Sequence, residues 1–426
     1  MRYLAAVVMA GLALVVTFVP PPDPPMPDAE TGVETPPISV CPAVETGDQH
    51  STFSILSSVN GNGRLSAFAA GTETGAAEFS TGASGSVTLP ATDVGAVGLT
   101  GALIEMPSET TATAVTASGP SGFAAESCAD TPTVQAVISG GYTANGGAFQ
   151  LLLLNPYAGE ATVDLTVATE TGLESDTRFN SVIVPALSTI TIDMTDLIPG
   201  RERIAVTMTT TRGSVLAAGR QVDGERTALW RAVEPGVDWW LPVPGGGESK
   251  QLLITNPAAS EVQFRLDFYG PEGLVEEQQT GLIEARGEVI VPLTEVTTEP
   301  VGVRVISAEP LVSTLLIDSE EMLAATTGSQ VEAPSWLLPG ARGPAGGAGD
   351  VFVLNGGLET VTVTIRSLKE ESLVRNFELA SEDVLVTGLV EADGYRIEST
   401  GPVVALWTAL SGGDGSAALG IPLQDG

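Results

Sequence analysis

The sequence predicts an all-β protein built from tandem antiparallel β-sandwich repeats. First, aromatic residues make up only 5% of the chain while glycine (49) and proline (29) are plentiful, which suits many short strands separated by turns. Second, no stretch after Val19 has the period of an amphipathic helix. Third, an apolar run that ends in Asn followed by Pro or Gly occurs three times, at Asn155, Asn256 and Asn355. The spacing of about one hundred residues and the chain length of 426 together predict four similar units.

Each unit is expected to contain about seven short strands. After Asn256, for example, apolar and polar residues alternate over residues 261–273, as in a half-buried strand. Further strands are expected at 287–293, 301–307 and 310–319 in that unit, and at 394–401 and 402–410 in the last one. This number of strands is typical of immunoglobulin-like sandwiches, and a β-propeller with four-stranded blades is the alternative.

The repeated units also predict the domain boundaries. We expect a signal-anchor helix at residues 1–19, a proline-rich linker at 20–40, and β-sandwiches at 41–131, 132–236, 237–333 and 334–426. The linker is either a semi-rigid polyproline stalk or a flexible connection. The last residues, 419–426, resemble the start of another unit, and we expect them to pair back as an edge strand of the final sandwich.

The amino-terminal segment predicts a membrane anchor. The run from Tyr3 to Val19 has no charged residue, and its length lies at the short limit for a bilayer span. No small-x-small cleavage site closes the run, and three prolines follow Val19 directly, so we favour an uncleaved anchor over a cleaved signal peptide that would release a secreted protein. Because Arg2 precedes the run and the next basic residue is Arg64, the positive-inside rule leaves most of the chain outside the cell membrane.

The charge of the chain limits its partners. With 52 acidic and 18 basic residues, the formal net charge is −34. Such a surface repels polyanions, which excludes nucleic acid as an expected partner. The expected partners are the membrane, through the amino-terminal helix, and either other envelope proteins or cell-wall glycans.

Two cysteines, Cys41 and Cys128, predict one disulfide in the first sandwich. It would join the first strand of that sandwich to its last and stabilise it by roughly 4 to 5 kcal/mol. Two unpaired buried thiols are the alternative.

The order of several short motifs resembles a known family. The motifs are "GPSGFAAESC" at 119–128, "LLLLNP" at 151–156, "ATVDLTV" at 161–167, "WWLPVPGG" at 239–246 and "LLITNP" at 252–257. In this order they resemble an actinobacterial domain-of-unknown-function family of secreted or membrane-anchored proteins, with an amino-terminal hydrophobic segment and β-rich extracytoplasmic repeats. The resemblance implies a location at the cell envelope and brings no catalytic residues.

The sequence offers no convincing catalytic or metal-binding group. His50 is the single histidine, no nucleophile pattern accompanies it, and one histidine with two distant cysteines lacks zinc-ligand spacing. We therefore expect no catalytic residue, no metal and no cofactor. A glycoside hydrolase would need two converging carboxyl groups, and among 52 acidic residues no pair stands out.

The tryptophans are the best candidates for ligand contact. Trp239, Trp240, Trp336 and Trp407 could stack on sugar rings, or they could be packing residues. Trp240 and Trp336 precede similar motifs, "LPVPG" and "LLPG", which favours packing. Solvent exposure of either ring would support glycan binding, and burial of both would remove that argument.

These observations predict a non-catalytic, membrane-anchored extracytoplasmic scaffold or interaction protein of the cell envelope. A module that binds envelope polysaccharide is the alternative, and a glycoside hydrolase ranks third.

Overall fold

The computed structural model describes residues 37–45, 50–82, 85–96, 98–108, 110–119, 122–129, 133–245, 249–270, 273–274, 279–293, 299–320, 322–339, 349–368, 373–389, 394–411 and 414–423. The expected anchor helix and most of the expected linker lie outside these residues. Within them, no helix is both long and apolar enough to cross a membrane. Residues 37–426 form one compact unit. The described chain is almost entirely antiparallel β-structure, as the sequence predicts.

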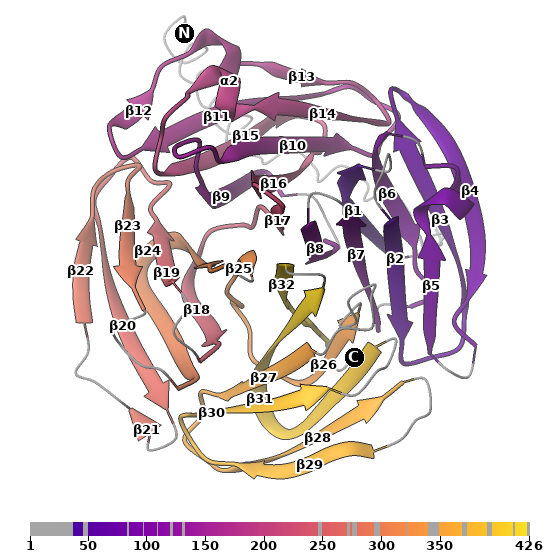
Figure 1. Ribbon diagram of the computed structural model, residues 1–426, viewed down its shortest axis with the longest axis vertical. Helices are drawn as coiled ribbons and strands as arrows, with labels where there is room; N and C mark the ends of the chain where they lie inside the picture. The colour runs from indigo at the N-terminus through magenta and orange to yellow at the C-terminus, as the bar shows by residue number, and fades with distance from the viewer. Residues whose placement is uncertain are drawn as a thin grey trace, which may run out of the picture. The chain divides into compact units, whose positions relative to one another are not determined.

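The strands β1–β8, here called repeat 1, form two four-stranded sheets with the orders β1-β6-β3-β4 and β5-β2-β7-β8 (Figure 1). The strands are β1 (Ile38–Glu45), β2 (His50–Ser57), β3 (Asn62–Ala69), β4 (Thr72–Ser80), β5 (Ser86–Pro90), β6 (Leu99–Glu105), β7 (Thr111–Gly119) and β8 (Gly122–Ser127), with a 3₁₀ turn, η1 (Ala91–Val94), after β5. Buried side chains of both sheets, including Phe53, Leu65 and Val115, form one core. Because β1 begins at Ile38 and Val40 is buried, the folded region starts slightly before the end of the expected linker.

Repeat 2, made of β9–β17, also has two sheets, with the orders β14-β10-β16-β17 and β12-β11-β15-β9; β13 adds to β11. The strands are β9 (Gln135–Gly141), β10 (Ala148–Asn155), β11 (Ala161–Thr169), β12 (Gly172–Glu174), β13 (Val182–Val184), β14 (Ser188–Asp193), β15 (Ile204–Arg212), β16 (Leu216–Asp223) and β17 (Arg226–Arg231). Two single turns, η2 (Thr177–Phe179) and α2 (Met194–Leu197), interrupt them.

Repeat 3 contains β18 (Gly236–Val243), β19 (Ser249–Thr255), β20 (Val262–Gly270), β21 (Gly273–Leu274), β22 (Gln279–Ile283), β23 (Glu288–Pro292), β24 (Val301–Asp318) and β25 (Leu323–Thr327). Repeat 4 contains β26 (Ala333–Pro339), β27 (Gly349–Asn355), β28 (Val361–Ser367), β29 (Leu373–Leu379), β30 (Asp383–Leu389), β31 (Gly394–Ser411), β32 (Asp414–Leu419) and β33 (Ile421–Pro422). Within the described residues the sheets close into neither a barrel nor a propeller, so the propeller alternative gains no support.

One long strand serves both sheets of repeat 3, and another does so in repeat 4. The sequence predicts that a new strand begins at Pro310 and another at Pro402, but β24 and β31 each continue through the proline. Pairing of β24 with β20 ends at Ser307 and its pairing with β19 begins at Val312, and Pro310 lies between them. The strand β18 pairs with β24 on both sides of this proline, at Ile306 and at Leu311. Proline has no N–H to donate, and at a corner between two sheets no ladder bond requires one.

Each repeat ends by pairing back to its own first strand. Ala129 exchanges two backbone hydrogen bonds with Val40, and corresponding pairs join Val233 to Val137 and Ser329 to Trp240. In repeat 4 the same place is taken by β33, which pairs with β26 through Ile421–Leu337 and Pro422–Trp336. The prediction that the last strand pairs back at the edge of the final repeat is therefore confirmed.

The recurring asparagines are buried and hold equivalent turns. Asn256 donates through Nδ2 to the carbonyls of Ser260 (2.7 Å) and Glu284 (2.9 Å), and its Oδ1 accepts from the N–H of Ala258 (2.9 Å). Asn155 and Asn355 bond in the same way, each to the N–H two residues on and the carbonyl four residues on. A buried amide that bonds the backbone at three points fixes the turn after the strand.

In repeat 1 two hydroxyl groups replace this asparagine. Ser57 Oγ accepts from the N–H of Val59, two residues on, and Thr81 Oγ1 donates to the carbonyl of Gly61, four residues after Ser57. Both side chains are buried. The first repeat therefore forms the turn with Ser57 and Thr81 in place of an asparagine.

Leucines that directly precede these turns pack on glycines of a neighbouring repeat. A Cβ added to Gly101 would lie 2.6 Å from Leu154 of repeat 2, one at Gly302 2.3 Å from Leu354 of repeat 4, and one at Gly394 2.5 Å from Leu56 of repeat 1. Because Leu56 and Gly394 belong to the first and last repeats, the two ends of the array are in direct contact. The glycines are needed for this close approach.

Candidate functional site at the junction of four strands

One strand from each repeat contributes to a shared junction. The strands β8 and β25 each contact both β17 and β32, and Figure 1 shows the four strands meeting at the centre of the compact unit. Their small buried residues allow the close approach: Ala124, Ala125, Ala228, Ala324, Ala325, Ala417 and Ala418. No backbone ladder joins the four strands to one another, so other polar contacts must satisfy the backbone groups that face the junction.

The carboxylate of Asp414 binds the backbone of all four strands. Its Oδ2 accepts from the N–H groups of Phe123 and Thr227, both at 2.9 Å. Its Oδ1 accepts from the N–H of Leu323 at 3.2 Å and from that of Gly415 at 2.8 Å. The residue is only 2% exposed. One side chain therefore satisfies buried donors from β8, β17, β25 and β32.

Gly122 makes room for that carboxylate. Its φ is +104°, and a Cβ at this position would lie 2.2 Å from Asp414 Oδ2. Any L-residue here would both strain the backbone and clash with the acid. Burial raises the pKa of Asp414, and its four backbone N–H donors oppose that rise.

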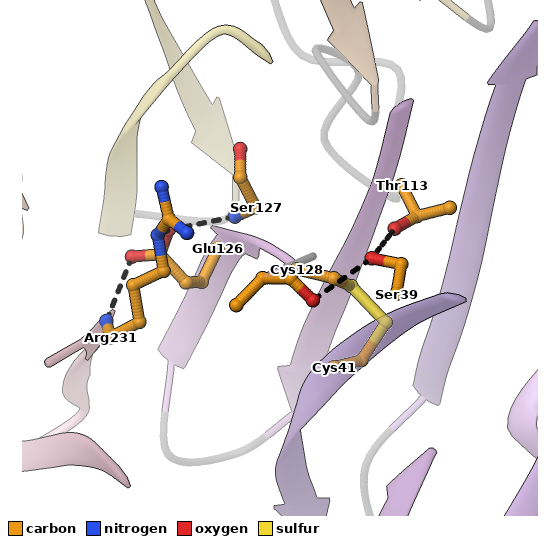
Figure 2. The surroundings of a disulfide bond; sticks show 8 residues. Ser39, Cys41, Thr113, Glu126, Ser127, Cys128 and Arg231 are labelled. Atoms are coloured by element: carbon orange, nitrogen blue, oxygen red, sulfur yellow. Dashed lines mark hydrogen bonds and ion pairs between the residues drawn. A yellow bond between two sulfur atoms is a disulfide. The ribbon is translucent and has the colours of Figure 1, made fainter. Parts of the chain in front are cut away.

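A second buried acid, Glu126 of β8, links repeats 1 and 2 (Figure 2). Its carboxyl oxygens accept from the N–H of Ser127 (2.8 Å) and of Arg231 (3.2 Å), and the Arg231 guanidinium lies 3.9 Å away. Burial raises the pKa of Glu126 to about 7, against the lowering effect of Arg231 and of the two N–H donors. The group therefore titrates near neutral pH although its charge is partly compensated.

The disulfide lies next to Glu126 and Arg231 (Figure 2). Cys41 on β1 is bonded to Cys128, directly after β8, with Cα atoms 4.3 Å apart. This is the bond that the cysteine count predicts. Figure 2 shows Ser39 beside it, whose hydroxyl hydrogen-bonds Thr113 Oγ1 at 2.6 Å. The disulfide thus covalently fixes the return pairing of Val40 with Ala129, which in repeats 2–4 depends on hydrogen bonds alone.

A cavity of about 270 Å³ adjoins the disulfide and is lined by residues of every repeat. Cys128, Arg231, Trp239 and Ile421 are among its lining residues. Among the described residues, its ionisable lining consists of Arg231 and Glu234. The described lining therefore does not supply the two facing carboxyl groups that glycoside hydrolysis requires.

The candidate tryptophans are all buried, with exposed fractions of 1% (Trp239), 4% (Trp240), 0% (Trp336) and 0% (Trp407). None presents a ring face to a sugar in this structure, which removes the argument for glycan stacking on these rings. Trp240 stacks on Tyr269 with ring centroids 5.9 Å apart, and the Arg304 guanidinium lies 4.2 Å from its ring centroid. These side chains pack the interior.

The expected equivalence of Trp240 and Trp336 is wrong by one residue. Trp239 Nε1 donates to the carbonyls of Gly236 and Leu311, and Trp336 Nε1 donates to those of Ala333 and Val403. Gly236 pairs with Leu311 just as Ala333 pairs with Val403, so Trp239 corresponds to Trp336. Counting back three residues from Pro242 and from Pro339 gives the correct pair from the sequence.

The structure describes no catalytic or metal-binding contact of the remaining candidates from the sequence. His50 begins β2, and its side chain lies outside the description. Among the described residues, no three His, Cys, Asp or Glu side chains are placed to hold a metal ion.

Sequence reasoning missed Asp414, Glu126 and Gly122. The available signal is that "GFAAES", "LAATT" and "DGSAAL" all place small residues in the last full strand of their repeats. That pattern could have predicted a crowded junction, but not which acid occupies it.

The fold and the junction define a class: an all-β protein of four two-sheet repeats joined through buried polar contacts. A model of the Family of unknown function (DUF5719) matches residues 99–229 and 231–416, and the chain belongs to this family. No curated protein matches the chain.

Two solved structures show weak likeness. The Thermotoga maritima 1070 crystal structure is 16% identical, covers 23% of this chain and 96% of its own, and has a TM-score of 0.20. A tetra-tandem repeat from the extending region of a large adhesion protein is 12% identical, covers 91% of this chain and 99% of its own, and has a TM-score of 0.11. Neither informs the function.

Proposed function

We propose that this protein is a non-catalytic scaffold or interaction protein of the cell envelope, anchored in the membrane by residues 1–19 with its repeats outside. The disulfide between Cys41 and Cys128 carries the proposal, because disulfides persist in oxidising compartments and are rare in the cytosol. The uncharged run that ends at Val19 supports the anchor. The resemblance to actinobacterial envelope proteins supports the same location.

The chemistry of the junction supports a structural role. The carboxyl oxygens of Asp414 and Glu126 accept hydrogen bonds from the protein's own backbone. A catalytic acid needs access to substrate, whereas these groups are 2% and 4% exposed. Four repeats held together in this way present a large surface and are suited to binding other proteins.

The test is protease treatment of intact actinobacterial cells that express the full chain with a carboxy-terminal tag. We expect an impermeant protease to remove the tag while a cytoplasmic marker survives, and the protein to remain in the membrane after an alkaline wash. In the matched control, a cleavable signal peptide replaces residues 1–36, and the tagged repeats should appear in the medium. A protease-resistant tag would contradict the proposed location, and release of the unaltered chain would contradict the anchor.

Partners are then identified by chemical crosslinking and purification of the anchored protein. A scaffold predicts specific envelope proteins that the released control does not capture at the same yield. Turnover of a cell-wall glycan by the purified protein would contradict the non-catalytic proposal.

A further inference from the structure

A pocket of about 550 Å³ lies between the first and last repeats. Repeat 1 contributes the turn after β2, including Ser58 and Asn60, and repeat 4 contributes Arg366, Arg396 and Glu398 from two neighbouring strands. The pocket adjoins the contact between Leu56 and Gly394 that joins these repeats. It is distinct from the junction around Asp414.

The charges in this pocket differ from those of the chain as a whole. Arg366 on β28 lies directly opposite Arg396 on β31. Like charges at directly opposed positions of a sheet destabilise it. The two guanidinium groups share one carboxylate, Glu398, at 3.5 Å and 3.1 Å. In a chain with 52 acidic and 18 basic residues, the described lining of this pocket therefore carries an excess of positive charge, with two arginines and one glutamate.

The arginines also have unused hydrogen-bonding capacity. Nε of Arg396 is buried and has no hydrogen-bond partner among the described residues. Each guanidinium carries five N–H donors in a planar fork, which matches the geometry of a carboxylate or a phosphate. A single carboxylate cannot satisfy two such groups.

The other walls suit a ligand with both polar and apolar faces. Leu368 lines the pocket and packs on a buried apolar cluster formed by Leu56, Ala112, Leu337 and Leu423. Asn60 on the opposite wall is exposed, and its amide both donates and accepts hydrogen bonds. A sugar ring has this combination of C–H faces and hydroxyl groups.

We propose that this pocket binds the negatively charged group of an acidic saccharide, and that Arg366 and Arg396 hydrogen-bond to that group. The charged group is a carboxylate, as in a uronic acid, or a phosphate, as in a sugar-phosphate polymer. This site goes beyond the proposed scaffold role and does not depend on the protein being anchored.

The experiment is calorimetric titration of the full chain, purified in a non-ionic detergent, with galacturonate, inorganic phosphate and galactose. We expect at least one anion to bind, more weakly at high salt because the attraction is electrostatic, and neutral galactose not to bind at the same concentration. Stronger binding of galacturonate identifies a carboxylate ligand, and stronger binding of phosphate identifies a phosphate ligand. Equal binding of galactose, or no binding of either anion, overturns the proposal.

Three variants test the residues. The double variant Arg366→Ala, Arg396→Ala should lower the affinity at least about tenfold, because two charge-assisted contacts are lost. Glu398→Gln should raise it about threefold, because the competing carboxylate is neutralised while the shape is kept. Arg375→Ala, an exposed arginine of the same sheet that does not line the pocket, should leave the affinity unchanged.

If the double variant does not fold, as judged by its circular dichroism spectrum, Glu398→Gln decides. An affinity unchanged in Glu398→Gln, or equal affinities in the wild type and a folded double variant, would overturn the assignment.

Discussion

Asp414 shows how a single residue can connect a large β-protein. Its two carboxyl oxygens accept four backbone N–H bonds, and three of the donors, Phe123, Thr227 and Leu323, come from other repeats. A buried donor without a partner costs about 1 to 3 kcal/mol. Asp414 thus removes the free-energy cost of unpaired N–H groups where four strands meet without backbone pairing between them.

Asp414→Ala should therefore destabilise the protein by at least about 3 kcal/mol, since several buried N–H groups lose their acceptor at once. Asp414→Asn should have a smaller effect, because one oxygen remains as an acceptor. The effect should still be destabilising, because the amide nitrogen cannot accept a hydrogen bond from the N–H groups that it faces. Urea denaturation followed by circular dichroism measures both. The control Asp196→Ala, at an exposed aspartate, should be close to neutral. Equal stability of Asp414→Ala and the control would show that water replaces the carboxylate.

Glu126 makes stability depend on pH near neutrality. Its pKa is about 7 in the folded protein and 4.5 in the unfolded chain, so the folded state binds the proton more tightly. Its stabilising contribution is complete below pH 4.5 and is lost as the pH rises through 7, amounting to about 3 kcal/mol at most. The free energy of unfolding should fall over this range, and Glu126→Gln should flatten the fall. Identical pH profiles of the two proteins would refute this assignment.

At the scale of elements, local patterns predict the strands and turns well. The same turn follows the second strand of three repeats and is marked by Asn155, Asn256 and Asn355. The sequence reveals it because an Asx turn depends only on residues close together in the chain. The sequence does not reveal that Ser57 and Thr81 share this task in repeat 1, since the two residues are far apart in the chain. It also does not reveal that β24 and β31 run through their prolines.

The strand β33 is an element whose importance can be measured. It pairs with β26, and Leu423 beyond it is 5% exposed and lies in the apolar cluster with Leu56. Deletion of residues 419–426 should lower the melting temperature, because an edge pairing and two buried leucines, Leu419 and Leu423, are lost. Leu358→Ala, at a leucine 86% exposed in the same repeat, serves as the control and should not change it. An unchanged melting temperature of the truncated protein would mean that repeat 4 is complete without β33.

At the scale of the molecule, contacts between repeats decide the behaviour, and these were beyond sequence reasoning. The pairs Leu56–Gly394 and Phe123–Asp414 join residues some three hundred positions apart, and nothing near either residue in the chain specifies its partner. The repeat period predicts four similar units but leaves open whether they are independent. The tryptophans illustrate the same limit: their burial depends on packing partners such as Arg304 and Tyr269, which lie well away from Trp240 in sequence.

The contacts between repeats predict that residues 37–426 unfold as one cooperative unit. Independent sandwiches joined by linkers would melt separately, but here Asp414 bonds all four repeats and Leu56 packs the first on the last, so the loss of one repeat exposes surfaces of the others. Differential scanning calorimetry should show one transition, with a van't Hoff enthalpy close to the calorimetric enthalpy. Reduction of the disulfide should lower the midpoint of that transition without splitting it, because the cross-link in repeat 1 then stabilises the whole. Two resolved peaks, or a shift confined to one of them after reduction, would instead show that repeat 1 unfolds independently.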